Sequence, residues 1–271
     1  MRCSFVCEDT TKETKYTLVI ADGGSVVIED CTLSQFNLVK GFLEFAPEVE
    51  VIDVMNVSAS NTTISGSSLI SLSQPFLSSM LIDKARENTK QRVRVNSSSF
   101  VNITCLENRA SVMSVGSFLS GMECVIEGCV LTKCMSERSL DGGGMKISMK
   151  RGDSEVKVSG CSFEMSVCLT GNGRGGGMMI DALDPNVECS NTEIQPLGLR
   201  LENIRFMMND AFVGKDVFIR CDSIDLQMNE RLFELNFSQE ALKGEKSMCG
   251  SDGEGKVDVD LMPLIAFNYS S

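Results

Sequence analysis

The residues with the clearest capacity for chemistry are aspartates and arginines in the second half of the chain. They are Asp181, Asp184, Asp222 and Asp225, with Arg174, Arg200 and Arg220 nearby in sequence. Aspartates that bind calcium beside an arginine base are the machinery of lyases that cleave acidic polysaccharides, and calcium needs several converging oxygen ligands. The best combination is Asp181 and Asp222 with Arg220. Because no motif shows that these side chains converge, the sequence favours solvated turns at these positions.

The absence of histidine limits the chemistry that the chain can perform. The chain also lacks tryptophan and has only two tyrosines. Histidine is the usual general base near neutral pH and the commonest metal ligand, so Ser-His-Asp catalysis, Cys-His catalysis and histidine metal sites are excluded. Aromatic rings that could stack on sugars are scarce. We therefore expect no catalytic, cofactor-binding or metal-binding residues, with a carbohydrate-active lyase or hydrolase as the alternative.

Charge and hydropathy limit the partners of the chain. The formal net charge of −12 repels phosphate backbones, so no nucleic-acid partner is expected. No apolar run reaches about 18 residues, so we expect no direct membrane insertion. The first residues, MRCSFVCEDTTKETK, lack the apolar stretch of a signal peptide, which leaves a cytosolic chain or a fragment of a longer one.

An eight-residue pattern recurs along the chain. The template is apolar-x-apolar-x-x-[small or Cys]-x-[Leu or Phe], and a second apolar segment, such as GGGMKI or GGGMMI, follows each copy. Successive copies begin 36, 31, 31, 32 and 43 residues apart. The six copies are VVIEDCTL (26–33), TTISGSSL (62–69), VRVNSSSF (93–100), CVIEGCVL (124–131), VKVSGCSF (156–163) and LRLENIRF (199–206).

The repeat predicts an all-β solenoid. Apolar and polar residues alternate within each copy, as in Val156-Lys157-Val158, and this period of two indicates strands with one buried face. One repeat cannot bury its apolar face alone, whereas stacked copies can. A unit of about 31 residues with few hairpin signals favours a parallel β-helix over a propeller blade. The only helix that the sequence suggests lies within residues 76–92.

We expect about six rungs of roughly 31–36 residues with one longer insertion. The expected organisation is an N-terminal cap or partial rung (1–24), a parallel β-helix (25–240), and a polar loop with a C-terminal strand or cap (241–271). The glycine runs DGGGMK (141–146) and GNGRGGG (171–177) precede strands rather than open helices. They are therefore expected to form tight corners and not phosphate loops.

The twelve cysteines are expected to be free, buried thiols. They are too sparse for a disulfide-held scaffold, and the series Cys124, Cys129 and Cys134 lacks zinc-site spacing. Cys129 and Cys161 share one template slot with Cys31, where the other copies carry Ser67, Ser98 and Ile204. Stacked rungs lie about 4.8 Å apart. A disulfide prefers Cβ atoms roughly 3.5–4.5 Å apart, so Cys129 and Cys161 are predicted to stay reduced.

Two motifs resemble those of a known family. The segment FMMN (206–209) resembles the F-x-x-N motif of polymorphic outer membrane protein repeats, and GGGM (142–145 and 175–178) resembles their G-G-A-[ILV] motif, with Met in place of the aliphatic residue. The resemblance covers roughly residues 25–240. It implies a right-handed β-helix of the pectin-lyase-like class, like that of similar protist proteins, and a non-enzymatic role at a cell surface.

Several surface features bear on binding. The spacing between the last two copies is enlarged by the segment ALDPNVECSNTEIQP (182–196), and insertions in solenoids often lie on the binding face. We expect any contact with a protein or glycan ligand at Asp184, Asn186, Glu188 and Glu193. Glycosylation sequons, which favour an extracellular or cell-surface location, occur at Asn56, Asn61, Asn96, Asn102, Asn236 and Asn268.

The function that the sequence favours is a non-catalytic, extracellular or surface-associated module for adhesion or binding. A fragment of a longer structural solenoid is a further alternative.

Overall fold

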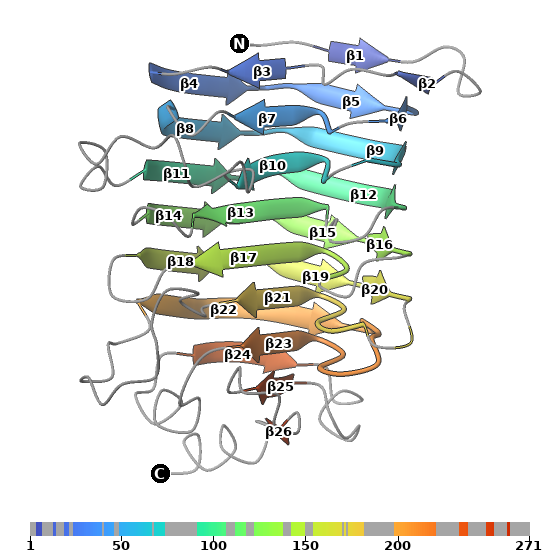
Figure 1. Ribbon diagram of the computed structural model, residues 1–271, viewed down its shortest axis with the longest axis vertical. Coiled ribbons are helices and arrows are strands. Elements are labelled where there is room, and N and C mark those ends of the chain that lie inside the picture. Colours follow the sequence, from blue (N-terminus) through green and yellow to red (C-terminus); the bar gives the residue numbers. More distant parts are fainter. Residues whose placement is uncertain are drawn as a thin grey trace, which may run out of the picture.

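The computed structural model shows a parallel β solenoid (Figure 1). Its strands form one sheet of 17 strands and one of nine strands. In Figure 1 the nine-stranded sheet runs leftwards on the near side and the other sheet runs rightwards behind it, while successive coils descend. This path is a right-handed β-helix, as expected. The structure describes residues 4–6, 13–14, 19–21, 24–39, 41–45, 49–66, 68–73, 91–106, 112–117, 122–137, 142–149, 154–169, 171, 173–181, 198–220, 233–237, 248–251 and 259–260.

The strands are short, and most coils contribute to both sheets. In the 17-stranded sheet they are β1 (Ser4–Val6), β2 (Glu13–Thr14), β4 (Gly24–Glu29), β5 (Thr32–Ser34), β6 (Asn37–Leu38), β8 (Val49–Met55), β9 (Ser58–Ile64), β11 (Gln91–Asn96), β12 (Ser99–Cys105), β14 (Met122–Glu127), β15 (Val130–Thr132), β16 (Met135–Ser136), β18 (Glu155–Ser159), β19 (Ser162–Glu164), β20 (Val167–Cys168), β22 (Leu199–Met207) and β24 (Phe233–Phe237). In the nine-stranded sheet they are β3 (Val19–Ala21), β7 (Leu43–Phe45), β10 (Ile70–Ser73), β13 (Met113–Ser117), β17 (Met145–Met149), β21 (Met178–Asp181), β23 (Val217–Arg220), β25 (Met248–Ser251) and β26 (Val259–Asp260).

The register of the stack confirms five of the six predicted copies. Inward residues of β11, β14, β18 and β22 pair in one column: Val95 with Ile126, Ile126 with Val158, and Val158 with Leu201. These side chains are fully buried in one continuous core. The alternation of Val158 inward and Lys157 outward, expected from the period of two, is also present.

The second copy is placed wrongly by the sequence template. Ile28 pairs with Val54 of β8, and Val54 pairs with Val95, so the second coil uses IDVMNVSA and not TTISGSSL. Ile64 instead pairs with Leu38 and Cys105 at a later point of the coil. The spacings between stacked partners become 26, 41, 31, 32 and 43 residues, so two of them are enlarged. The suggested helix at 76–92 lies almost wholly outside the described residues; its last two positions, 91–92, begin β11.

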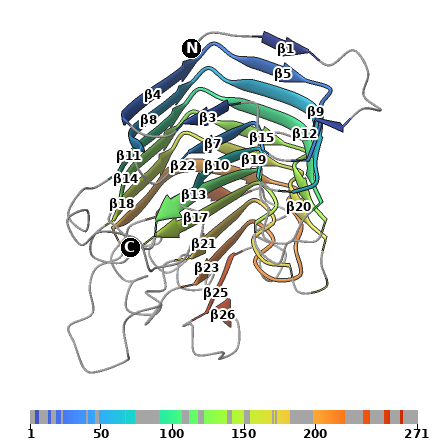
Figure 2. The same ribbon diagram turned by 45° about the horizontal axis from the view of Figure 1, so that its top comes forward.

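The 17-stranded sheet bends sharply between β4 and β5 and at the same place in every following coil (Figure 2). Left-handed residues lie at this bend and at a second one five residues later. In nearly every coil the residue that follows the left-handed one is buried, because the turn directs it into the core. Left-handed positions favour Gly, Asn and Asp. The first column is Asp30, Asn56, Ser97, Gly128, Gly160 and Asn203; the second is Gln35, Asn61, Asn102, Lys133, Met165 and Met208.

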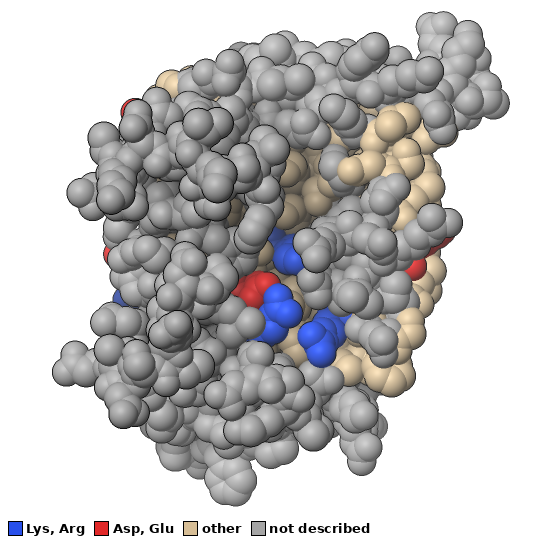
Figure 3. Space-filling model, viewed as in Figure 1, with Lys and Arg blue, Asp and Glu red and all other residues tan. Residues whose placement is uncertain are grey.

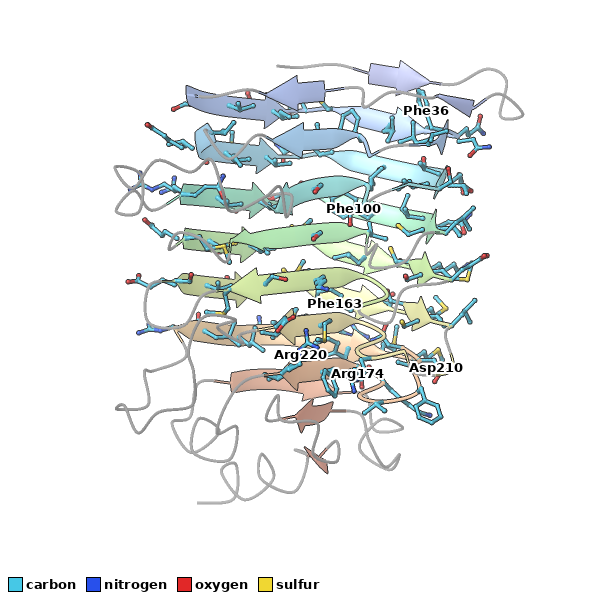
Figure 4. All side chains as sticks on the ribbon, viewed as in Figure 1. Phe36, Phe100, Phe163, Arg174, Asp210 and Arg220 are labelled. Atoms are coloured by element: carbon cyan, nitrogen blue, oxygen red, sulfur yellow. The ribbon has the colours of Figure 1, made fainter. Side chains whose placement is uncertain are left out.

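Large aromatic side chains fill the core beneath the second part of the bent sheet. Phe100, Leu131, Phe163 and Phe206 stack in register from β12 to β22. The rings of Phe163 and Phe206 are stacked, with centroids 5.3 Å apart and planes inclined by 17°. Figure 4 shows Phe100 and Phe163 at different levels within the coil stack.

The glycine runs form tight corners before β17 and β21, as predicted. Gly142 and Gly175 have φ of 70° and 65°, and Gly214 of the next coil has 60°. A Cβ atom at Gly176 would lie 2.3 Å from the carbonyl oxygen of Lys215, so only glycine allows the coils to approach this closely. Backbone packing therefore accounts for these glycines.

The asparagine of FMMN ties two coils together inside the protein. Asn209 is buried; its Nδ2 donates to the carbonyl of Phe163 at 3.0 Å and to Oδ1 of Asp216 at 2.8 Å. Its Oδ1 accepts from the backbone N–H of Ser166 at 2.9 Å. Asp216 follows Gly214 at the position that Gly177 occupies one coil earlier. The motif asparagine is therefore part of the core.

Candidate functional site

The outer side of the nine-stranded sheet holds Asp181 and Arg220, two of the residues that the sequence singled out for chemistry. In β21, Met178 and Ile180 belong to the main core, so the alternating Met179 and Asp181 face outward. Asp181 pairs in register with Arg220 of the neighbouring strand β23. Figure 3 shows acidic and basic side chains together near the centre of this face. The strands thus bring together two residues that are 39 positions apart.

Asp181 and Arg220 form a two-bond ion pair. Nε of Arg220 donates to Oδ1 of Asp181 at 3.1 Å, and the terminal nitrogen Nη2 donates to Oδ2. The side chain of Asp181 is 7% exposed and that of Arg220 is 28% exposed. Both carboxylate oxygens are engaged by one planar guanidinium, the strongest geometry for such a pair. This arrangement positions the arginine and occupies the oxygens that a metal ion would need.

Arg174 lies on the same side of the protein, close to Arg220 (Figure 4). The backbone of Arg174 forms a parallel β-bridge with Val213 of the next coil. The guanidinium carbon of Arg174 lies 4.8 Å from the centre of the Phe218 ring. Phe218 packs with Met179 and Val213 in a small cluster apart from the main core. A cation over an aromatic face is stabilising, so Arg174 has a packing role here.

Of the other residues weighed for catalysis or ligand binding, only Arg200 lies within the described part of the chain. Arg200 is exposed in β22 of the other sheet, where it pairs with Lys157. Asp222 and Asp225 lie outside the described residues, as does the whole proposed binding loop 182–196 with Asp184, Asn186, Glu188 and Glu193. Of the residues weighed for the lyase alternative, the structure therefore joins Asp181 with Arg220, and Arg174 lies close by.

The sequons fall at the bends and on strands. Asn56, Asn61 and Asn102 are exposed at left-handed bend positions, whereas Asn96 is half-buried at the end of β11. Asn236 lies in β24, and Asn268 lies outside the described residues. The separation of these asparagines by exposure was not predictable from the sequons alone.

Three apolar side chains near the second bend are more than half exposed, which the sequence analysis missed. Leu169, Met208 and Phe212 are 56%, 60% and 64% exposed. Val167 and Asp210 form a bridge between adjacent coils, and Leu169 and Phe212 each follow their bridge residue by two positions. Apolar residues at outward positions break the alternation of the earlier coils, and this break was the available signal.

The predicted stacking of Cys129 and Cys161 is confirmed. Ser162 N–H donates to the carbonyl of Cys129 at 2.9 Å, and both cysteines are free and buried. In the second coil, the position equivalent to Cys129 and Cys161 is occupied by Val57 and not by Ser67, because the template misplaced that coil. A hydrogen bond with Cys161, together with burial, raises the pKa of Cys129, and the same bond lowers the pKa of Cys161. Burial raises the pKa of Cys105 and of Cys124 to about 12.

We expect the buried cysteines to react slowly with a thiol reagent until the protein unfolds. The thiolate is the reactive form. Burial blocks access to all of these thiols, and it also raises the pKa of Cys105, Cys124 and Cys129. Because the pKa of Cys105 and Cys124 rises from 9.0 to about 12, stability should also fall as pH rises through that range, where only the unfolded chain loses these protons. Labelling kinetics and mass spectrometry of the non-reduced protein provide the measurement. A Cys129–Cys161 bridge, or labelling as fast as in guanidinium, would contradict the expectation.

Among the described residues, no group of three or more acidic or cysteine side chains is arranged to hold a metal ion. Within the same ranges, no helix has the length and apolar character needed to cross a bilayer. Comparisons with protein-family models, with curated proteins and with solved structures find no match.

Proposed function

We propose that the chain is a non-catalytic β-helix module that binds a protein or glycan ligand at an extracellular surface. The ion pair between Asp181 and Arg220 gives the main support. A lyase needs carboxylates free to bind calcium and a base free to take a proton. Among the described residues of the candidate set, the carboxylate of Asp181 and the guanidinium of Arg220 are bonded to each other. The pair links the neighbouring strands β21 and β23 and so has a structural role.

The resemblance to polymorphic outer membrane protein repeats supports the same proposal. The glycines of GGGM and the asparagine of FMMN are engaged in backbone approach and core hydrogen bonds. These motif residues maintain the packing between coils and are buried. Such a motif suits a repeat family in which the fold is constant and the outer surface varies. Membership of the pectin-lyase-like class and a surface role are parts of this proposal.

The exposed apolar side chains favour a protein over a glycan as the ligand. Leu169, Met208 and Phe212 stand on neighbouring coils of an otherwise acidic protein. Exposed apolar patches commonly mark contact surfaces, and Met and Phe are enriched in protein interfaces. Protein contact at these coils is compatible with additional contact through the 182–196 loop.

An assay for polysaccharide cleavage tests the proposal against its enzymatic alternative. The purified chain is incubated with polygalacturonate and other glycans, with and without calcium, and unsaturated product and new reducing ends are followed. We expect no turnover. Turnover that disappears in Arg220→Ala would reject the binding module in favour of a lyase.

A binding assay provides the second arm. Beads coated with the chain are presented to cell surfaces and to extracellular matrix proteins, and saturable attachment is expected. The double variant Leu169→Ser/Phe212→Ser should weaken attachment at least tenfold, whereas Val27→Ser, which alters a 45% exposed valine in β4, should not. Failure of the wild-type chain to bind any of these surfaces would contradict the proposal.

A further inference from the structure

Asn61 and Asn102 are stacked neighbours in the second left-handed column. They have φ of 49° and 54°, and both side chains are exposed. On either side of them β9 and β12 pair in register, Ser60 with Val101 and Thr62 with Ile103. Each asparagine begins a sequon that ends in threonine, and these threonines, Thr63 and Thr104, are also ladder partners. The bend thus presents two acceptor amides one above the other.

The amide nitrogens of the four described sequon side chains are in different situations. Nδ2 of Asn102 donates to Oδ1 of Asn61 at 2.8 Å, and Nδ2 of Asn56 donates to Oδ1 of Asp30 at 3.1 Å. Asn96 is half-buried, and its Oδ1 is buried with no hydrogen-bond partner. Among the hydrogen bonds of the described residues, none uses Nδ2 of Asn61. Asn61 is therefore the sequon asparagine whose amide nitrogen is exposed and would lose no hydrogen bond if a sugar were attached to it.

We propose that Asn61 is the N-glycosylated residue of this bend. The sugar donor is a lipid-pyrophosphate-linked oligosaccharide, and the sequon is Asn61-Thr62-Thr63. Nδ2 of Asn61 forms a bond to C1 of the first sugar, the bond from C1 to the pyrophosphate oxygen breaks, and the lipid pyrophosphate leaves. One amide proton passes to a base of the transferase. No oxidant or reductant is needed.

The stacking also means that Asn61 and Asn102 cannot both carry a glycan in the same folded molecule. Neighbouring coils lie about 4.8 Å apart, and a pyranose ring is wider than this spacing. Transfer takes place on the nascent chain, so the fold acts afterwards by accepting some glycan patterns and opposing others. A sugar on Asn61 leaves Oδ1 of that residue free to accept from Asn102, whereas a sugar on Asn102 replaces one of the two hydrogens on the donor nitrogen and crowds the contact with Asn61. The fold accepts one glycan here, on Asn61.

This inference rests on the extracellular placement in the proposed function, but its test is independent of ligand binding. The full chain is directed into the secretory pathway of a eukaryotic host by an added signal peptide. Secreted protein is mapped by mass spectrometry after enzymatic release of glycans in heavy-oxygen water, which marks each occupied asparagine. We expect Asn61 to be occupied in most molecules and Asn56, Asn96 and Asn102 to be unmodified.

Two matched variants test which asparagine carries the glycan without changing either asparagine side chain. Thr63→Ala destroys the sequon but keeps the Asn61 side chain and its bond from Asn102, so it should remove the glycan without loss of secretion. Thr104→Ala should change neither the glycan nor secretion. Secreted wild-type chain with Asn61 unmodified, or with Asn61 and Asn102 modified on the same molecules, would overturn the proposal. Binding measured with unglycosylated bacterial protein tests the proposed function separately, so the two can fail independently.

Discussion

Val158→Asp is expected to lower the free energy of unfolding by about 4 kcal/mol, because it places an unpaired charge in the centre of the coil stack. Val158 is 0% exposed and lies between Ile126 and Leu201, its partners in the coils on either side. Neither neighbour can hydrogen-bond a carboxylate. Urea unfolding followed by far-ultraviolet circular dichroism measures the change.

Val125→Asp provides a matched control with the same chemical change. Val125 faces outward in β14, and its partners in the neighbouring coils are Arg94 and Lys157. A carboxylate between two cations should leave stability within about 1 kcal/mol of the wild type. Lys157→Asp should cost a similarly small amount, since it removes only a half-exposed pair with Glu202. Equal effects of the Val158 and Val125 changes would show that the register is wrong.

Asn209→Ala is expected to cost about 3 kcal/mol, because it removes one hydrogen bond from each of three buried polar groups. These groups are the carbonyl of Phe163, the N–H of Ser166 and the carboxylate of Asp216, which is only 2% exposed. The loss should appear as a lower urea midpoint with an unchanged denaturant dependence.

Ser166→Ala tests whether the loss of stability in Asn209→Ala comes from the broken hydrogen bonds or from any truncation at this buried place. The hydroxyl of Ser166 is buried in the same place but has no hydrogen-bond partner. Its removal should therefore be neutral within about 0.5 kcal/mol or slightly stabilising. If Asn209→Ala were as mild as Ser166→Ala, the asparagine would not be joining the two coils.

The fold was largely predictable because stacking forces equivalent residues into the same environment in each coil. The template failed at the second coil for a local reason. There Val57 stands where the other coils have a small residue or cysteine or Ile204, and Ala59 where they have Leu or Phe, so the true segment was rejected. TTISGSSL was accepted because Ile64 and Leu69 are also inward residues with the same spacing. A period of two identifies the buried side of a strand but not its place in the coil.

The contacts of the candidate sites depend on register, which the sequence pattern does not fix. Asp181 and Arg220 meet because β21 and β23 pair without a shift across a connection of many residues. The bond between Asn102 and Asn61 likewise needs two bends of unequal coils to coincide. Sequence reasoning named Asp181 and Arg220 and all the sequons, but only the stacked strands show which side chains touch.

The orientation of the ladders has a mechanical consequence. Hydrogen bonds between coils lie along the axis of the stack, and β1 and β26 are at its opposite ends (Figure 1). Tension applied between those ends pulls along the bonds and opens one junction at a time, like a zipper, while a sideways load shears a whole ladder at once. Each coil of 31 residues, such as that between Val95 and Ile126, would release about 100 Å of chain as it peels away. A tether attached at the two ends would therefore lengthen in steps under a weak pull, and one gripped across the coils would hold firm.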